Sequence, residues 1–354
     1  MKIVRLTTLL DFGGQERKYI SFTDDGPQAL RHDYVFAAIG HGGHAEKAIR
    51  DKGFDVHIFQ RNPAVRNLWN IVVLWRWFRH IRPDVVHTAA AEANFHGIIA
   101  ARLAGVPTII AEEIGFPRHS KWARRVFARL YRRVYKVVCV SESVKAFLQS
   151  IGEIQPEKGV VLYNPVVSPG LRPRVPSEVF TLVCVGRLEP VKNQALLIRA
   201  LGNMQHTQVR LCLVGDGSDR AALEQLVQTL GLSERVTFTG FTADPTQYLR
   251  RGDVFVLPSL SEGFGIAVVE AMLQELPCLC SNVGGIPEFI HEGDNGWLFD
   301  PHDEAALVAR LDVLAATSGD ALRRIGQNAR VSVENRFTTT HYRLSLENLY
   351  EKRL

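Results

Sequence analysis

The segment Ser261-Glu262-Gly263-Phe264-Gly265-Ile266-Ala267-Val268-Val269-Glu270-Ala271-Met272 joins a strand signal to a helix signal. It follows the apolar run Val254–Leu257, which Pro258 ends and which is typical of a buried strand. Gly263 and Gly265 give the backbone freedom to turn, and the apolar residues 266–273 predict a helix immediately afterwards. The sequence therefore predicts a strand, a short loop and a helix in direct succession.

An anion site is predicted at this turn. The first N–H groups of a helix lack intrahelical partners and, together with the helix dipole, they attract negative charge. Glu262 and Glu270 lie on either side of the turn, eight positions apart. Because a carboxylate does not bind an anion, each is expected to accept hydrogen bonds from hydroxyl groups of the same ligand. A phosphate flanked by hydroxyl groups describes a sugar nucleotide; the simpler alternative is two solvated glutamates beside an ordinary turn.

The length and the charge distribution indicate two halves of different character. A chain of 354 residues exceeds what one hydrophobic core usually supports, so two domains are expected. The composition, 46% hydrophobic and 22% charged, is typical of a globular protein. Residues 1–165 contain 24 Lys and Arg against 15 Asp and Glu, a net charge of +9, and residues 166–354 contain 18 against 22, a net charge of −4. The basic half is therefore expected to meet an anionic partner.

Cysteine usage and hydropathy favour a cytoplasmic protein. The five cysteines lie mostly in apolar, strand-like runs, and none has the spacing of zinc ligands. The apolar run at the N-terminus is too short for a signal peptide, and no stretch has the length of a transmembrane helix. We expect buried, reduced thiols and a location in the cytoplasm.

Strand-like and helix-like runs alternate along both halves. In the first half, strands are predicted at residues 2–9, 34–39, 56–59, 84–87, 108–111, 137–140 and 159–162. In the second half they are predicted at residues 180–185, 210–214, 236–238, 254–257 and 278–281. Strands separated by single helices predict an α/β fold with a parallel, doubly wound sheet in each half. The proline-rich residues 163–177 are typical of a linker, which divides the chain into domains 1–165 and 166–335.

Two basic residues are candidates for holding phosphates. Arg187 and Lys192 follow the strand that opens the second half, and each can add charge-assisted hydrogen bonds of about 1.5–3 kcal/mol to one anion. The chain has no Asp-x-Asp pair, the clamp through which many sugar transferases hold a divalent cation on the diphosphate. We therefore expect no metal site, and the alternative for the two residues is ordinary surface charge.

These residues resemble the retaining glycosyltransferases of family 4. Glu262 and Glu270 match that family's Glu-x7-Glu motif, and Gly186-Arg187-Leu188-Glu189-Pro190-Val191-Lys192-Asn193 is similar to its Gly-Arg-Leu…Lys-Asn segment. Three further turns are similar to family motifs in the same order: Gly13-Gly14-Gln15-Glu16, Gly215-Asp216-Gly217 and Gly284-Gly285-Ile286-Pro287-Glu288. The resemblance covers nearly the whole chain. It implies the GT-B fold, with two Rossmann-like, doubly wound domains facing a central cleft and a C-terminal helix, residues 336–354, that crosses back to the first domain.

The resemblance also implies an activity and a set of contacts. The donor is a nucleotide-sugar, and the frequency of UDP-linked donors in the family favours a UDP-sugar. The implied assignments are the diphosphate to Arg187 and Lys192, the ribose to Glu270, the transferred sugar to Glu262, Gly263 and the backbone of Phe264 and Gly265, and a phosphate contact to Gly14. The implied reaction retains the anomeric configuration and needs no metal or other cofactor. Arg187, Lys192 and Glu262 then act mainly by electrostatic stabilisation around the departing diphosphate.

One position departs from the family pattern. After the strand at residues 108–111 the family commonly has a histidine that contacts the sugar, whereas spacing puts Glu113 there in this chain. His119 and His87 are near in sequence but out of register. A carboxylate cannot donate a hydrogen bond as an imidazole N–H does. Glu113 is therefore a candidate sugar or acceptor contact, and misalignment by a few residues is the alternative.

The basic half contains a candidate membrane or acceptor surface. Residues 118–136 include eight Lys and Arg and no acidic residue, and they predict a helix with an aromatic and aliphatic stripe. The candidate surface residues are Trp122, Arg125, Arg129, Arg132 and Arg133. Aromatic and basic residues on one helix are typical of binding to an anionic membrane. The alternative is a helix whose apolar face joins the core and whose basic face is only solvated.

The favoured interpretation is a glycosyltransferase on the cytoplasmic face of a membrane. Its expected partners are the nucleotide-sugar, a glycan, lipopolysaccharide-type or lipid-linked acceptor and an anionic membrane surface, and nucleic acid is not expected. A nucleotide-sugar 2-epimerase shares the two-domain architecture and is the alternative enzyme, which turnover of donor without acceptor would reveal. A non-catalytic module that binds sugar nucleotides is the third possibility.

Overall fold

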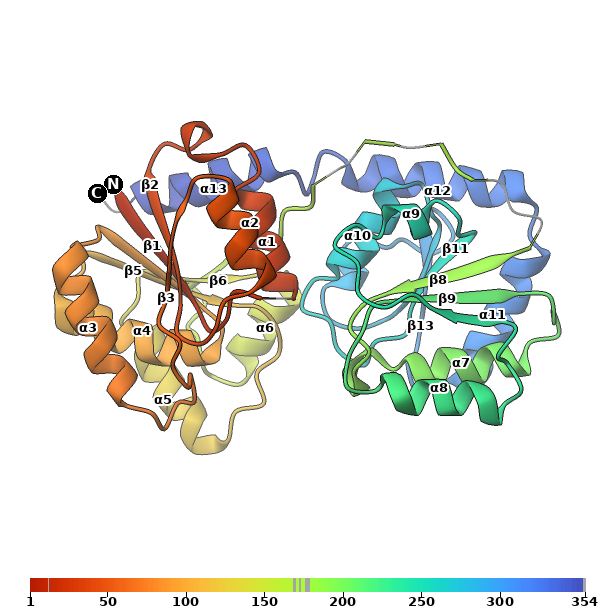
Figure 1. Ribbon diagram of the computed structural model, residues 1–354, viewed down its shortest axis with the longest axis horizontal. Coiled ribbons are helices and arrows are strands. Elements are labelled where there is room, and N and C mark those ends of the chain that lie inside the picture. The colour runs from red at the N-terminus through yellow and green to blue at the C-terminus, as the bar shows by residue number, and fades with distance from the viewer. Residues whose placement is uncertain (12, 168–169, 172, 176–178, 353–354) are drawn as a thin grey trace. The chain divides into compact units, whose positions relative to one another are not determined.

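The computed structural model describes residues 1–11, 13–167, 170–171, 173–175 and 179–352. The chain folds into two compact units (Figure 1). Unit 1 comprises Met1–Val166 and Phe337–Leu354, and unit 2 comprises Val167–Arg336. The predicted linker, residues 163–177, lies partly outside the described residues.

Unit 1 is built on a seven-stranded sheet with the order β3-β2-β1-β4-β5-β6-β7, in which neighbouring strands are parallel. Its strands are β1 (Lys2–Thr7), β2 (Asp33–Ala38), β3 (Asp55–Ile58), β4 (Val85–Ala89), β5 (Thr108–Glu113), β6 (Lys136–Cys139) and β7 (Gly159–Val161). Its α-helices are α1 (Gly14–Phe22), α2 (His44–Asp51), α3 (Trp69–Ile81), α4 (Ala91–Ala104), α5 (Lys121–Tyr131), α6 (Glu142–Ser150) and α13 (Thr339–Glu351).

Unit 2 repeats the design with a six-stranded parallel sheet of order β10-β9-β8-β11-β12-β13. Its strands are β8 (Thr181–Val185), β9 (Arg210–Val214), β10 (Val236–Phe238), β11 (Val254–Leu257), β12 (Cys278–Ser281) and β13 (Gly296–Phe299). Its α-helices are α7 (Gln194–Asn203), α8 (Arg220–Thr229), α9 (Thr246–Leu249), α10 (Ile266–Leu273), α11 (Glu304–Ala316) and α12 (Gly319–Val333). Short 3-10 turns lie at Pro190–Lys192 and Ile286–Glu288 in this unit and at Pro27–Ala29 in unit 1.

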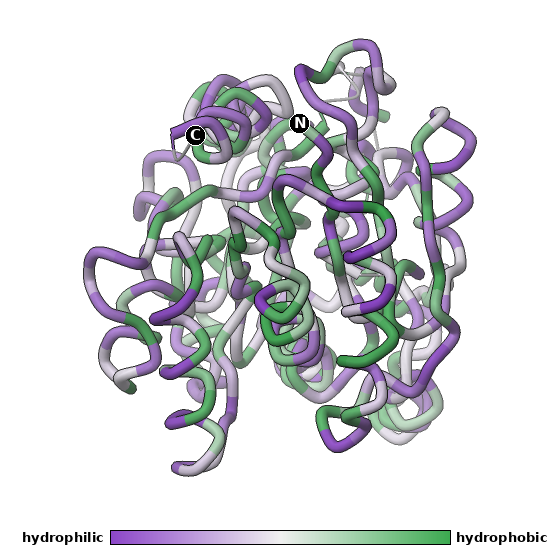
Figure 2. Tube along the Cα trace, turned by 90° about the vertical axis from the view of Figure 1, so that its left-hand side faces the viewer, coloured by the Kyte–Doolittle hydropathy of each residue, from purple (hydrophilic) through white to green (hydrophobic). Residues whose placement is uncertain are grey.

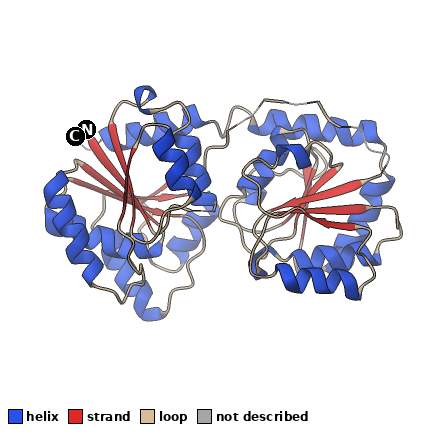
Figure 3. Ribbon diagram, in the orientation of Figure 1, coloured by secondary structure: helices blue, strands red, loops and turns tan. Residues whose placement is uncertain are grey.

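Helices cover both faces of each sheet (Figure 3). The strands of such a sheet are buried on both sides, which explains why β11 is apolar at every position and fully buried. The outer helices alternate between hydrophobic and hydrophilic residues along the tube in Figure 2, as expected for helices with one buried face. The two Rossmann-like, doubly wound domains predicted from the alternation are confirmed.

The predictions left out helices α6, α9 and α12 and strand β13. Helices α6 and α12 each begin after a serine, Ser141 and Ser318, whose side chain accepts a hydrogen bond from a backbone N–H of the first turn. Those capping residues were the available sequence signal. Strand β13 has only four residues and starts with Gly296, so its local pattern is weak, and pairing with β12 makes it a strand. The helix predicted within residues 118–136 is shorter in the structure and spans Lys121–Tyr131.

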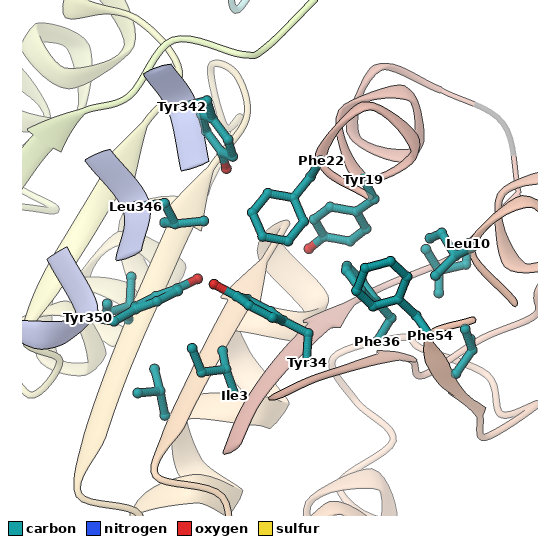
Figure 4. Packing of buried hydrophobic residues seen from close by; sticks show 14 of the residues in the cluster. Ile3, Leu10, Tyr19, Phe22, Tyr34, Phe36, Phe54, Tyr342, Leu346 and Tyr350 are labelled. Atoms are coloured by element: carbon teal, nitrogen blue, oxygen red, sulfur yellow. The ribbon is translucent and has the colours of Figure 1, made fainter. Parts of the chain in front are cut away.

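The last helix of the chain belongs to unit 1. Tyr342, Leu346 and Tyr350 are spaced four residues apart, so they form one stripe of α13, and all three are buried. Figure 4 shows them projecting from α13 toward Phe22 and Tyr34. The ring of Tyr342 packs edge-on to that of Phe22, with centroids 6.2 Å apart. The stripe therefore completes the hydrophobic core on the face of the sheet that α1 also covers.

Each sheet has a point where the strand order reverses. In unit 1 it lies between β1 and β4, and in unit 2 between β8 and β11. The connections that follow the two central strands leave toward opposite faces at such a point, so their first loops open a crevice at the carboxyl edge where ligands bind. Among the helices of the described residues, none combines the length and the apolar character needed to span a bilayer.

Candidate active site

The candidate site of unit 2 lies at the carboxyl ends of β8 and β11. Arg187 and Lys192 follow β8, and the loop with Ser259 and Glu262 follows β11. Because these strands are direct neighbours at the reversal point, their loops meet at one edge of the sheet. The backbone N–H of Leu260 also donates to the carbonyl of Val191 at 2.8 Å, which ties one loop to the other.

Lys192, Glu262 and Ser259 form the centre of this site. The Lys192 Nζ lies 2.5 Å from the Glu262 Oε1, and the Ser259 hydroxyl donates to the same oxygen at 2.8 Å. Ser259 is fully buried and Glu262 is 8% exposed. The structure thus places in direct contact two residues that the sequence assigned to the diphosphate and to the sugar. It adds Ser259, whose only sequence signal was its position three residues before Glu262 in the same loop.

The side chain of Arg187 is more exposed than that of Lys192. Its side chain is 58% exposed and its Nη1 lies 2.8 Å from the Glu189 Oε1. An exposed ion pair of this kind contributes only about 0–1 kcal/mol. An incoming anion can therefore replace Glu189 at the Arg187 guanidinium at little cost.

The turn after β9 packs against the Arg187 loop and forms backbone hydrogen bonds with it. The Leu188 N–H donates to the Asp216 carbonyl at 2.9 Å, and the Leu188 carbonyl accepts from the Asp219 N–H at 2.9 Å. A Cβ on Gly217 would lie 2.3 Å from the Leu188 oxygen, and one on Gly215 would lie 1.9 Å from the carbonyl oxygen of Gly186. Glycine is needed here because two backbone segments pack directly against each other.

Helix α10 directs its first N–H groups at the same edge. It starts after Gly265, which has φ +101° and provides no side-chain cap for the first turn. Phe264 is buried and its ring packs on that of Phe289, so its predicted contact with a ligand, through its backbone, stays a prediction. Glu270 lies within α10 and is half-buried. The start of α10 therefore provides N–H donors that its N-cap side chain leaves uncapped and the positive end of the dipole.

Gly14, the predicted phosphate contact of unit 1, is the first residue of α1. The preceding Gly13 has φ +154°, and the first turn of the helix has no side-chain cap. Gly14 is exposed. The turn follows β1 at the reversal point of the unit 1 sheet and so occupies the position where a doubly wound sheet binds its ligand.

Glu113 is enclosed by unit 1 in this structure. Its carboxyl group is 3% exposed, and its Oε1 accepts hydrogen bonds from Tyr131 and, at 3.0 Å, from Asn94. Burial raises the pKa of Glu113 to about 7, against the opposing effect of these two hydrogen bonds. The side chain is thus directed to α4 and α5, and its predicted contact with a sugar or acceptor would require it to turn outward.

The two histidines near Glu113 in sequence have different surroundings. His119 lies flat on Phe127, with centroids 4.2 Å apart, and pairs with Glu153 at 2.8 Å, which raises the pKa of His119. His87 lies inside the sheet on β4, and its Nδ1 is 2.7 Å from the Tyr350 hydroxyl. Neither takes the place of a histidine that donates to a ligand.

Helix α5 presents its basic face to solvent. Phe127, Leu130 and Tyr131 form its buried face. The residues predicted as a membrane or acceptor surface are exposed: Trp122, Arg125, Arg129, Arg132 and Arg133. Among them, Trp122 is 70% exposed and lies outside the core. The helix therefore has one apolar side that is buried in unit 1 and a solvent-exposed side with aromatic and basic residues.

Unit 2 also has a groove away from the carboxyl ends of β8 and β11. A shallow groove of about 500 Å³ lies between the end of α7 and α11, lined by residues that include Asn203, Glu304 and Asp312. The Asn203 amide donates to Glu304, and Asp312 accepts from the backbone of Gln205, so its polar groups bond one another. Among the described residues, no three His, Cys, Asp or Glu side chains gather in a way that could hold a metal ion.

Two family models match the chain and together span most of it. The model described as "Glycosyltransferase Family 4" matches residues 13–167, and the one described as "Glycosyl transferases group 1" matches residues 172–332. The chain belongs to glycosyltransferase family 4. It is a transferase, and the loops described above lie within the two matched ranges. The comparisons give the 2-epimerase alternative no support.

Individual relatives agree with this assignment. The Escherichia coli UDP-Gal:alpha-D-GlcNAc-diphosphoundecaprenol alpha-1,3-galactosyltransferase is 28% identical over 329 residues, which are 84% of this glycosyltransferase and 83% of that protein. The Nocardia farcinica D-inositol 3-phosphate glycosyltransferase is 30% identical over 275 residues, 72% of this chain and 57% of that protein.

Solved structures show the same GT-B fold. Anabaena HepE in complex with UDP-glucose is 24% identical, with a TM-score of 0.87 over 99% of this chain and 100% of that one. The lipopolysaccharide outer core galactosyltransferase WaaB is 21% identical, with a TM-score of 0.78 over the full length of both chains. At these identities the likeness concerns the fold alone.

Proposed function

We propose that the protein transfers a sugar from a UDP-sugar to a glycan, lipopolysaccharide or lipid-linked acceptor, with retention of the anomeric configuration and without a metal ion. The observation that carries the proposal is the Lys192–Glu262–Ser259 arrangement beside the start of α10. The names of two relatives support the substrate classes. The Escherichia coli enzyme is named for UDP-Gal and a diphosphoundecaprenol-linked acceptor, and HepE was crystallised with UDP-glucose.

The paired state of Lys192 and Glu262 suggests how the donor enters. When the diphosphate arrives, the Lys192 ammonium can exchange part of its contact with Glu262 for phosphate oxygens. The Ser259 hydroxyl keeps hold of the Glu262 Oε1, so the other carboxylate oxygen becomes available to a hydroxyl of the sugar. Arg187 exchanges the exposed Glu189 for the same diphosphate. Glu270, on α10, is left for the ribose.

This arrangement favours departure of the nucleoside diphosphate. The bond to the sugar breaks as negative charge develops on the leaving phosphate, and Lys192, Arg187 and the start of α10 provide positive charge there. Because these groups are already oriented, stabilising the developing charge costs little reorganisation. Removal of one such group typically reduces turnover about 10²–10³-fold. On the proposed front-face path, the departing diphosphate also helps to deprotonate the acceptor hydroxyl.

A ligand screen followed by product analysis tests the proposal. UDP at about 100 times its Kd should add about 2.7 kcal/mol of apparent stability, whereas ADP and GDP should add much less. With a UDP-sugar and an acceptor, NMR of the product should show the anomeric configuration of the donor, and turnover should persist in EDTA. Inversion of the anomeric centre would overturn retention, and loss of activity in EDTA with recovery in Mg²⁺ or Mn²⁺ would overturn the metal-free mechanism.

We also propose that α5 binds the anionic surface of the cytoplasmic membrane that carries the acceptor. Its exposed Trp122 and arginines support this, since each basic residue near an anionic surface contributes about 1 kcal/mol. Wild-type protein should sediment with anionic vesicles at low salt and less so at high salt, because the Debye length falls from about 10 Å at 0.1 M to about 3 Å at 1 M.

A charge-matched pair of variants separates this interaction from general charge. The double variant Arg125→Glu/Arg129→Glu on α5 should lose vesicle binding. Lys47→Glu/Arg50→Glu changes the net charge equally on the exposed side of α2 and should retain it. If both pairs lose binding equally, or if the wild type stays in the supernatant, α5 is not a membrane contact.

A further inference from the structure

The loop that follows β5 in unit 1, residues 114–118, is held in place by side chains. It contains neither helix nor strand, and within the described residues its backbone N–H groups form no hydrogen bond with another backbone group. Ile114 and Arg118 are exposed, and a Cβ on Gly115 would meet no atom within 4 Å. Phe116 packs edge-on against Phe147 of α6, with ring centroids 5.2 Å apart. A loop with so few contacts opens easily unless its two ends are fixed.

His119 fixes the far end of the 114–118 loop to two other elements. Its ring is stacked on that of Phe127 in α5, and its Nδ1 lies 2.8 Å from the Oε1 of Glu153, between α6 and β7. The Glu153 side chain is fully buried. Among the residues that the structure describes, His119 is the only basic residue that pairs with Glu153, whose Oε2 has no hydrogen-bond partner. Because a buried carboxylate is costly without a cation, this contact depends on a protonated His119.

Glu113 fixes the near end of the loop as the last residue of β5. Both hydrogen bonds that it accepts, from Tyr131 and from Asn94, go to Oε1, so Oε2 is able to carry a proton. Burial raises the pKa of Glu113 to about 7, and the nearby Glu153 carboxylate acts in the same direction. Tyr131 and Cys139 beside it stay neutral, because burial raises the pKa of both. Proton loss from Glu113 therefore adds negative charge to the region that holds Glu153.

The two ends of the loop respond to pH in the same direction. The hydrogen bond to Glu153 raises the pKa of His119 against the effect of its burial, Glu113 adds to the rise, and Arg124 on α5 opposes it. At low pH Glu113 is neutral and His119 is a cation beside Glu153. At high pH Glu113 is an anion and His119 no longer compensates Glu153. The closed position of the loop therefore loses stability as pH rises.

We propose that the His119–Glu153 contact is a latch that keeps the 114–118 loop closed, and that its release turns Glu113 outward to the sugar or the acceptor. The loop leaves the carboxyl end of β5, next to β4 at the reversal point, where a doubly wound sheet binds its ligand. Release sends one proton from His119 and one from Glu113 to solvent. His119 and Glu153 touch no substrate and so are positioning residues. The inference rests on the proposed function, because it takes the ligand of Glu113 to be the transferred sugar or its acceptor.

The pH range of the latch follows from the two titrations. The stabilisation by Glu113 is complete below the pKa of an ordinary glutamate, 4.5, and is lost as pH rises through about 7. The stabilisation by His119 is complete below 6.5 and is lost as pH rises through its raised pKa. Since one pKa unit corresponds to a factor of about ten in the equilibrium, the released fraction should rise at least tenfold between about pH 5 and about pH 7.

Limited proteolysis of the full-length protein measures the released fraction. Proteinase K cleaves at many residue types over a wide pH range, and mass spectrometry locates the cuts within residues 114–118. A synthetic peptide of residues 112–121, digested in parallel, corrects for the pH dependence of the protease. When opening and closing are fast relative to cleavage, the corrected rate follows the population of the open loop.

Two substitutions separate the ends of the loop. His119→Arg keeps a cation beside Glu153 at every pH, so the rise in cleavage should end near pH 7. Glu113→Gln removes the other titration, so the rise should begin only above 6.5. The double variant should show a constant corrected rate. His206→Gln is the matched control, because His206 pairs with Asp312 in unit 2 at 2.9 Å, and it should leave cleavage of the loop unchanged.

The wild-type profile decides the proposal even if a variant fails to fold. A corrected cleavage rate that stays constant or falls as pH rises would overturn the latch, and so would a double variant that keeps the wild-type profile. In the transfer assay His119→Arg should be slower than the wild type above pH 7, and equal rates would overturn the role of the released Glu113 in the reaction. Transfer by a wild type with constant cleavage refutes only the latch, whereas absence of UDP binding refutes only the proposed function.

Discussion

The turn that supports the Arg187 loop provides a sharp test of the site geometry through Gly217→Ala. The added Cβ would lie 2.3 Å from the Leu188 oxygen and 2.8 Å from both the Leu188 nitrogen and its carbonyl carbon. Ordinary contacts of a Cβ begin near 3.4 Å, so one backbone segment must retreat by about 1 Å. The two hydrogen bonds of Leu188 to Asp216 and Asp219, both 2.9 Å, resist that movement.

The expected effect has a stability part and a binding part. Overpacking of this kind costs about 1–3 kcal/mol. In a unit of this size each kcal/mol lowers the melting temperature by about 2–4 °C. Because Arg187 lies next to Leu188, the displaced loop also misplaces the guanidinium, and one charge-assisted hydrogen bond contributes about 1.5–3 kcal/mol. UDP affinity should therefore fall at least tenfold.

Gly202→Ala is the matched control in the same unit. Gly202 lies in α7, and its Cβ would make an ordinary 3.5 Å contact with Leu232. Because glycine is less favourable than alanine in a helix by roughly 0.5–1 kcal/mol, this variant should be neutral or slightly more stable. Calorimetric titration with UDP and thermal unfolding measure both variants. If Gly217→Ala melts and binds UDP like the control, backbone packing does not position Arg187.

Further outcomes are expected at other residues. Lys192→Ala should reduce turnover about 10²–10³-fold in steady-state assays, and a loss below tenfold would exclude it from diphosphate stabilisation. Glu270→Gln should weaken the binding of UDP and of the full donor alike. Glu262→Gln should leave the binding of UDP unchanged and reduce the rate of transfer. If both variants weaken UDP binding equally, the separate roles of the two glutamates are refuted. Burial raises the pKa of Glu113 to about 7 from 4.5, so its contribution to folding stability is complete at acidic pH and is lost as pH rises through 7. The melting temperature of Glu113→Gln relative to wild type should therefore increase from about pH 5 to about pH 8, and a constant difference would contradict the burial of an ionisable group there.

Much of the candidate site in unit 2 could be predicted from local patterns in the sequence. A glycine-rich loop between an apolar strand and a helix places its residues at the carboxyl edge of a parallel sheet, which is why Arg187, Lys192 and Glu262 could be assigned to the same edge before their contacts were known. The partner of each side chain was not predictable in this way. Lys192 pairs with Glu262, seventy positions away, because two loops meet at the reversal point of the sheet.

Glu113 shows the limit of sequence spacing. Its position two residues after the predicted strand 108–111 suggested a ligand contact, which stays a prediction, and the structure shows a buried carboxyl group that Asn94 of α4 and Tyr131 of α5 hold by hydrogen bonds. Trp122 was a candidate surface residue, and the first turn of α5 leaves it exposed, whereas Phe127 and Leu130 of the same helix are buried. Whether a side chain is buried or exposed depends on elements that are distant in the chain and pack against it.

The order of apolar runs, glycines and prolines by itself determined the α/β class, the two parallel sheets and the loops that carry the motifs. These features depend on the periodicity of one strand or helix and on backbone freedom at single residues, which are local properties. The return of the C-terminal helix to the first domain was implied by the family resemblance, whereas the tertiary structure alone decided which residues of α13 join the core of unit 1 and that Arg5, Lys18 and Glu112 form ion pairs in one buried place. Charges separated by up to 107 positions interact strongly only when folding removes the water between them, because the lower dielectric then makes their mutual energy large.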